Sequence, residues 1–153
     1  MEKIEYNLID NSISFFIDSL EKAIRSKNEP NQWKFAIFSL IQAIELSVKE
    51  CLRKEHEIFI YSNIDCPKHT VSIDVAIRRL SNIQKIEISD EDKRFIEIAK
   101  AWRNSIVHHQ FKFSLKKVKT VFSVLLGFYT NFFQMNLKSN ISSARTKIED
   151  IYL

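Results

Sequence analysis

The chain of 153 residues has little glycine and little proline, with one glycine and two prolines in all. Both residues interrupt helices, and turns rich in them separate the strands of sandwiches and barrels. Their scarcity, together with abundant Lys, Glu, Ile, Leu and Phe, argues against a β-sandwich. We therefore predict an all-α fold, a bundle of about five helices plus a short C-terminal helix, in a single domain over residues 1–153.

Cysteines and long apolar runs are also scarce. Cys51 and Cys66 are too few for a disulfide framework, which favours a reducing compartment. The longest apolar stretch, residues 121–133, is interrupted by polar residues and is shorter than a membrane span. Residues 1–8 are charged and lack the apolar segment of a signal peptide. We expect a cytoplasmic protein without membrane contact.

Several motifs of common enzyme classes are missing. The chain has no glycine-rich phosphate loop, which excludes nucleotide hydrolysis of the P-loop type. Cys66 and His69 have the spacing of half a zinc site, but no second pair with ligand spacing exists. No set of Glu-x-x-His motifs typical of di-metal bundles occurs. We predict that the protein uses neither a metal nor another cofactor.

Apolar residues recur at three- and four-residue intervals along most of the chain, which predicts amphipathic helices. Ser89 followed by three acidic residues is typical of a helix start, and we expect that helix to end near Arg103 to His109. Residues 58–61 are expected to form a short extended segment. The other predicted helices span about residues 7–26, 30–54, 72–82, 114–137 and 140–152.

The segment Arg103-Asn104-Ser105-Ile106-Val107-His108-His109 contains the residues closest to a reaction centre. Arg103 offers forked donors that suit phosphate oxygens, and either imidazole can transfer protons near neutral pH. Asn104 and His108 share a helix face, whereas Arg103 and His108 lie about 140° apart on an ideal helix. Two copies across a symmetric dimer would bring both residue types to one cleft. The alternative is an exposed, solvated helix end.

Charged residues at two other places in the chain also suggest specific roles. Glu45 lies in the apolar stripe of the second predicted helix, where a carboxylate is costly unless it is paired. It either reaches water at the edge of the stripe, near Lys49, or has a buried partner. The modest net charge of +4 permits contact with nucleic acid without requiring it. A basic segment can follow an RNA backbone or form a solvated face; its residues are Lys112, Lys116, Lys117 and Lys119.

Arg103-Asn104-x-x-x-His108, placed after an acid-capped helix, resembles the signature of the HEPN superfamily. Residues 36–52 (AIFSLIQAIELSVKECL) are similar to the second helix of that family, with its A-x-E-x-x-x-K core. Residues 69–80 (HTVSIDVAIRRL) resemble the short middle helix of several members. Together these segments cover about residues 7–137, in the family's order.

The resemblance implies a helical bundle that forms a homodimer with the active site at the interface. Many members are metal-independent endoribonucleases of toxin–antitoxin, phage-defence or CRISPR-linked systems. It implies that Arg103 binds the scissile phosphate, that His108 is the general acid or base, and that Asn104 orients either group. It also implies that Glu45 holds Arg103 in place. His109 satisfies the permitted spacing as well, so the choice between the two histidines stays open.

The resemblance leaves two further points open. Toxins that a nucleotidyltransferase antitoxin silences often have Tyr two residues after the His, whereas this chain has Gln110 there. The resemblance therefore does not extend to that form of regulation, and the type of antitoxin protein that would be a partner stays open. The alternatives to an RNA-cleaving enzyme are a non-catalytic module that binds a nucleotide, RNA or a protein, and a structural dimer in which Arg103 only stabilises the interface.

Overall fold

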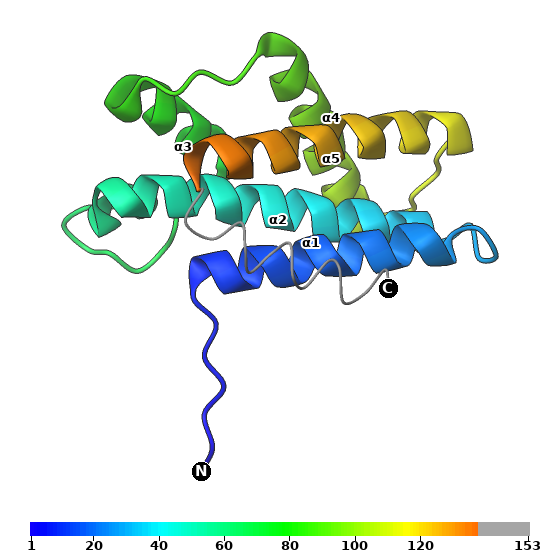
Figure 1. Cartoon of the computed structure of the whole chain (residues 1–153), viewed down its shortest axis with the longest axis horizontal. Coiled ribbons are helices and arrows are strands. Elements are labelled where there is room, and N and C mark those ends of the chain that lie inside the picture. The colour runs from blue at the N-terminus through cyan, green and yellow to red at the C-terminus, as the bar shows by residue number, and fades with distance from the viewer. Residues whose placement is uncertain (138–153) are drawn as a thin grey trace.

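The computed structural model describes residues 1–137, and these residues form five α-helices and two short helical turns without a strand (Figure 1). The predicted all-α bundle is confirmed, and α1, α2 and α5 lie within two residues of their predicted bounds. The predicted helix over about residues 140–152 lies outside the described residues. The elements are α1 (Leu8–Arg25), α2 (Gln32–Glu55), the 3-10 turn η1 (Glu57–Ile60), α3 (Ile73–Arg79), the π-helical turn η2 (Leu80–Gln84), α4 (Asp90–His108) and α5 (Leu115–Asn136).

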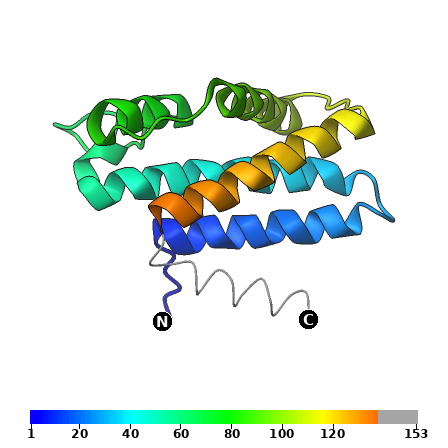
Figure 2. The same ribbon diagram turned by 45° about the horizontal axis from the view of Figure 1, so that its top comes forward.

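Helix α2 is the central element of the bundle. It contacts α1, α3, α4 and α5. In Figure 2 it lies in the layer between α1 on one side and α3 and α4 on the other, and α5 crosses it obliquely. Its buried residues therefore surround the helix instead of forming one stripe. A charged side chain on α2 is therefore costly unless a partner on α2 itself or on a neighbouring helix pairs with it.

Helices α1 and α2 form an antiparallel pair that small polar residues join. The Ser12 hydroxyl donates to the backbone oxygen of Ala43 at 2.7 Å, and the Ser39 hydroxyl donates to Asp18 Oδ2 at 2.6 Å. Both serines are buried, so these hydrogen bonds satisfy groups that water does not reach. Their short side chains let the two helices approach closely.

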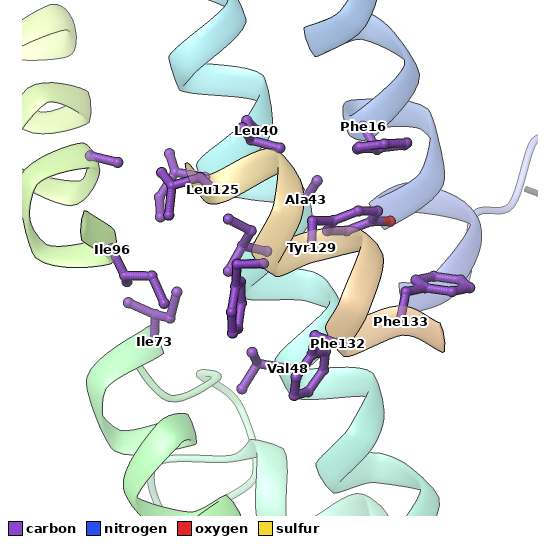
Figure 3. Packing of buried hydrophobic residues seen from close by; sticks show 14 of the residues in the cluster. Phe16, Leu40, Ala43, Val48, Ile73, Ile96, Leu125, Tyr129, Phe132 and Phe133 are labelled. Atoms are coloured by element: carbon purple, nitrogen blue, oxygen red, sulfur yellow. The ribbon is translucent and has the colours of Figure 1, made fainter. Parts of the chain in front are cut away.

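A layer of aromatic residues packs α5 against helices α1 and α2 (Figure 3). The rings of Phe16 and Tyr129 are stacked with centroids 4.3 Å apart, and the Tyr129 hydroxyl lies 3.0 Å from Ser12 Oγ. Phe132 and Phe133 continue the layer along α5 and are both buried. Burial of a side chain of this size contributes about 1.5–3 kcal/mol.

The start of α4 agrees with the sequence pattern. Ser89 Oγ accepts a hydrogen bond from the Asp92 backbone N–H at 3.1 Å, and three acidic residues occupy the first turn. Ile96 and Ala99 are the two buried residues of α4. Arg103 follows Ala99 by one turn, so it lies on the same side of the helix.

The predicted extended segment at residues 58–61 is wrong. Residues Glu57–Ile60 form η1, and only Tyr61 has the extended conformation, in a single antiparallel bridge to Thr70. Arg79 explains the arrangement, because its Nη1 donates to the carbonyl oxygens of Phe59 at 2.6 Å and Tyr61 at 2.8 Å. A cation that gathers two carbonyls favours a turn over a strand.

Candidate active site

Arg103 is held against α2 by two side chains. Its Nη1 donates to Gln42 Oε1 at 2.6 Å and to Glu45 Oε2 at 2.7 Å. The side chains of Arg103 and Glu45 are 20% and 17% exposed, so the ion pair is only partly screened by water. The pairing of Glu45 with Arg103 that the resemblance implies is therefore present.

Two nitrogen atoms of Arg103 remain available. Both hydrogen bonds within the described chain come from Nη1, which leaves Nε and Nη2 without a protein partner there. No buried side-chain polar atom in the described residues lacks a partner, so Nε and Nη2 reach solvent. A planar guanidinium anchored through one nitrogen presents its other donors in a fixed direction. That arrangement suits the oxygen atoms of a phosphate.

Glu45 has a second cationic partner on its own helix. Lys49 Nζ donates to Glu45 Oε1 at 2.9 Å and to Thr70 Oγ1 at 3.0 Å. Lys49 is buried, with 8% of its side chain exposed, and each of the two Glu45 oxygens serves one cation. Both interpretations of Glu45 from the sequence thus hold in part, since it lies beside Lys49 and also has a largely buried partner.

The environment shifts the titration of Glu45. Burial raises the pKa of its carboxyl, but hydrogen bonds and charge attraction from Arg103 and Lys49 outweigh that effect, and the net pKa lies below its ordinary value of 4.5. Glu45 is therefore ionised at neutral pH. Glu45, Lys49 and Arg103 together carry one excess positive charge, which favours an anion near the exposed donors of Arg103.

The other members of the Arg103–His109 segment lie apart from this ion pair. Asn104, His108 and His109 are exposed, and no hydrogen bond joins any of them to Arg103 within the described residues. His108 is the last residue of α4, and the His109 N–H caps the helix on the Ser105 carbonyl at 2.8 Å. Because Arg103 faces α2, the side of α4 that bears Asn104 and His108 faces solvent. Within one chain, Arg103 and His108 therefore lie on different sides of α4.

The four candidate lysines divide into two groups. Lys116 and Lys117 line a groove between α4 and α5 that also includes Arg94. Lys112 is in the segment of chain that connects α4 to α5, and Lys119 is on α5 outside the groove. All four are exposed. The structure therefore gives two of them a common surface with an arginine of α4.

Gln42 is a part of this site that was not predicted from the sequence. Gln42 precedes Glu45 by three residues and so lies on the same face of α2. Its position one turn before the carboxylate of Glu45 is the local signal for it, but its role depends on which residue of α4 stands opposite. Its amide oxygen gives Arg103 a second acceptor, which restricts the guanidinium more than a single ion pair does.

Two classes of feature are absent from residues 1–137. They contain no group of three or more His, Cys, Asp or Glu side chains arranged to hold a metal ion. None of the helices described over that range combines the length and apolar character of a membrane span.

Comparison with protein-family models, with curated proteins and with solved structures finds no match.

The lowered pKa of Glu45 predicts a pH-dependent effect on stability. At pH 7 Glu45→Gln should reduce the free energy of unfolding by about 1–3 kcal/mol, because two cations lose their partner. The carboxylate stabilises the fold above pH 4.5 and loses this effect as the pH falls through its lowered pKa. The difference between wild type and variant, measured by urea unfolding, should therefore shrink on acidification below pH 4.5.

Glu55→Gln is the matched control, because Glu55 is exposed at the end of α2 and forms no ion pair within the described residues. A Glu45→Gln deficit that stays constant from pH 7 to well below 4.5 would contradict the ionised role of Glu45.

Proposed function

We propose that the protein is a metal-independent endoribonuclease of the HEPN type, acting in a toxin–antitoxin or phage-defence system. The observation that carries the proposal is the anchored Arg103, whose Nη1 is held by Gln42 and Glu45 while its other donors reach solvent. The Arg-Asn-x-x-x-His pattern and the all-α bundle support it further. An antitoxin is the partner expected for a toxin of this kind.

Arg103 provides the electrostatic part of the reaction. Its exposed donors bind the scissile phosphate and stabilise the charge that builds up as the phosphorus becomes five-coordinate. Gln42 and Glu45 fix the guanidinium before RNA arrives, so little side-chain entropy is lost on binding. The excess positive charge of the cluster acts in the same direction.

His108 transfers the proton. The ribose 2′-hydroxyl attacks the adjacent phosphorus, and the bond to the 5′-oxygen of the next nucleotide breaks. An imidazole takes the proton of the hydroxyl or gives one to the departing oxygen. Asn104 lies on the same face one turn earlier and donates to the phosphate. The RNA supplies its own nucleophile, and the products carry a 2′,3′-cyclic phosphate and a 5′-hydroxyl.

The directions of Arg103 and His108 support a site shared by two copies of the chain. The two residues lie about 140° apart around α4, so within one chain they converge less well on a single phosphate. In a symmetric dimer, Arg103 of one chain and His108 of the other meet at one cleft. Val107 and Phe35 are 57% and 42% exposed. Val107 follows Arg103 by one turn of α4, and Phe35 precedes Gln42 by two turns of α2, so each lies near the face of one site residue. Exposed apolar residues there favour an interface.

A non-catalytic binding module is the second candidate, and one observation favours it. His108 is exposed at the last residue of α4, and no hydrogen-bond partner among the described residues orients its ring for proton transfer. The same cluster would then hold a phosphate group without turnover. Tight binding of RNA or a nucleotide, without products over hours, distinguishes this candidate from the enzyme.

Cleavage of single-stranded RNA in the presence of EDTA should depend on both residues. Arg103→Ala and His108→Ala should each lower the cleavage rate by about 100-fold or more, because the first removes charge stabilisation and the second removes proton transfer. His109→Ala should retain activity, since His109 caps the helix end outside the face of Asn104. Arg78→Ala and His69→Ala remove exposed residues elsewhere and serve as controls. Cleavage that persists in either site variant would overturn the assignment.

A mixing experiment tests the two-chain cleft. Co-expression of equal amounts of the Arg103→Ala and His108→Ala chains produces mixed dimers in which one cleft keeps both wild-type residues. Half of the dimers are mixed and each has one intact cleft, so activity should recover to about a quarter of the wild-type value. The measurement is the cleavage rate at equal total protein. Two inactive variants that stay inactive together would show that the site belongs to one chain.

A further inference from the structure

A groove separates the outer edges of α4 and α5. Its volume is about 400 Å³. Apolar side chains, cations and hydroxyl groups line it, and no acidic side chain does. The cations are Arg94, Lys116 and Lys117, and the apolar residues are Phe95, Ile98 and Val121.

Three aromatic residues continue this groove toward the end of α4. The rings of Trp102 and Phe111 meet edge to face with centroids 5.7 Å apart, and Phe111 stacks on Phe113 at 5.3 Å. All three are partly exposed. Lys117 joins the two features, because it lines the groove and its Nζ lies 5.9 Å from the centroid of the Trp102 ring.

We propose that this α4/α5 groove binds the phosphate backbone of a single RNA strand, with unpaired bases on the aromatic residues beside it. The inference rests on the proposed function and assigns a binding site for the substrate outside the reaction centre. Proteins hold single strands in positively charged grooves with aromatic side chains on which bases stack. Paired bases cannot reach such a surface, because their faces are stacked within the duplex.

Arg94 distinguishes this groove from a solvated run of lysines. It comes from α4, 22 positions before Lys116 in the sequence, and lines the same groove. The first turn of α4 carries Asp90, Glu91 and Asp92, which stabilise the helix dipole and repel phosphate. An RNA strand in the groove therefore ends short of these acids. From there it extends past Arg94 toward Trp102 and the end of α4.

An RNA strand that follows the groove approaches His108 rather than Arg103 of the same chain. Around an ideal helix, Ile98 in the groove lies about 80° from His108 and about 140° from Arg103. A strand in the groove therefore reaches the imidazole of the chain that holds it. The second copy then presents its arginine, which agrees with the two-chain cleft.

Binding can be measured apart from cleavage with a labelled single strand of about twelve nucleotides that carries 2′-O-methyl riboses and so has no nucleophile. The charge variant is Arg94→Gln with Lys116→Gln. The matched control is Arg25→Gln with Lys27→Gln, two exposed cations at the end of α1, on the other side of α2 from α4 (Figure 2). Fluorescence anisotropy over a series of salt concentrations gives the affinity and its salt dependence.

The groove variant should bind about ten-fold more weakly near 0.1 M salt, and its slope of log affinity against log salt should be smaller by about 1.4, since each lost phosphate contact removes about 0.7. The control should match wild type. In a Trp33→Phe background, the strand should also quench the fluorescence of Trp102. Equal losses in both double variants, or displacement of the strand by a poly-glutamate peptide at similar concentration, would overturn the assignment.

The two proposals can fail separately. If wild-type protein binds the strand through the groove but does not cleave ordinary RNA, the proposed ribonuclease activity is refuted and the proposed binding site is supported. If the groove variants cleave RNA with an unchanged KM, the proposed binding site is refuted and the proposed ribonuclease activity is supported.

Discussion

The carboxylate of Glu45 is the constraint on which the arrangement of the site depends. It lies on the central helix, largely out of water, where an unpaired charge would be costly. Lys49 and Arg103 each take one of its oxygens. The Arg103 contact crosses from α4 to α2 and, together with the burial of Ile96 and Ala99, sets the position of α4 along the bundle and its rotation about its own axis.

That rotation gives each face of α4 its role. The face toward α2 packs in the core and ends in the ion pair, the face toward α5 carries the basic groove, and the remaining face meets solvent with Asn104 and His108. A rotation by one residue position would move Arg103 out of reach of Glu45. The separation of arginine from histidine, which favours a two-chain site in the proposed reaction, follows from the same geometry.

The bundle and its helices could be predicted because periodic apolar residues and Ser89 are local signals. The error at residues 58–61 could not be seen from the sequence, since the turn there is stabilised by hydrogen bonds from Arg79, which belongs to a later helix.

Glu45 was noticeable as a charge in an apolar stripe. Gln42 was not, because its role depends on which α4 residue stands opposite. The meeting of Arg94 with Lys116 depends on how two helices cross, which no spacing along the chain reveals.

In the proposed reaction an anchored arginine and a histidine cleave RNA with the ribose as nucleophile. Mass spectrometry of the oligonucleotides formed by wild-type protein in EDTA tests this claim most directly, because the end groups record which atom attacked. We predict fragments that end in a 2′,3′-cyclic phosphate and fragments that begin with a 5′-hydroxyl. Intact RNA, or fragments with 3′-hydroxyl and 5′-phosphate ends, would contradict the claim.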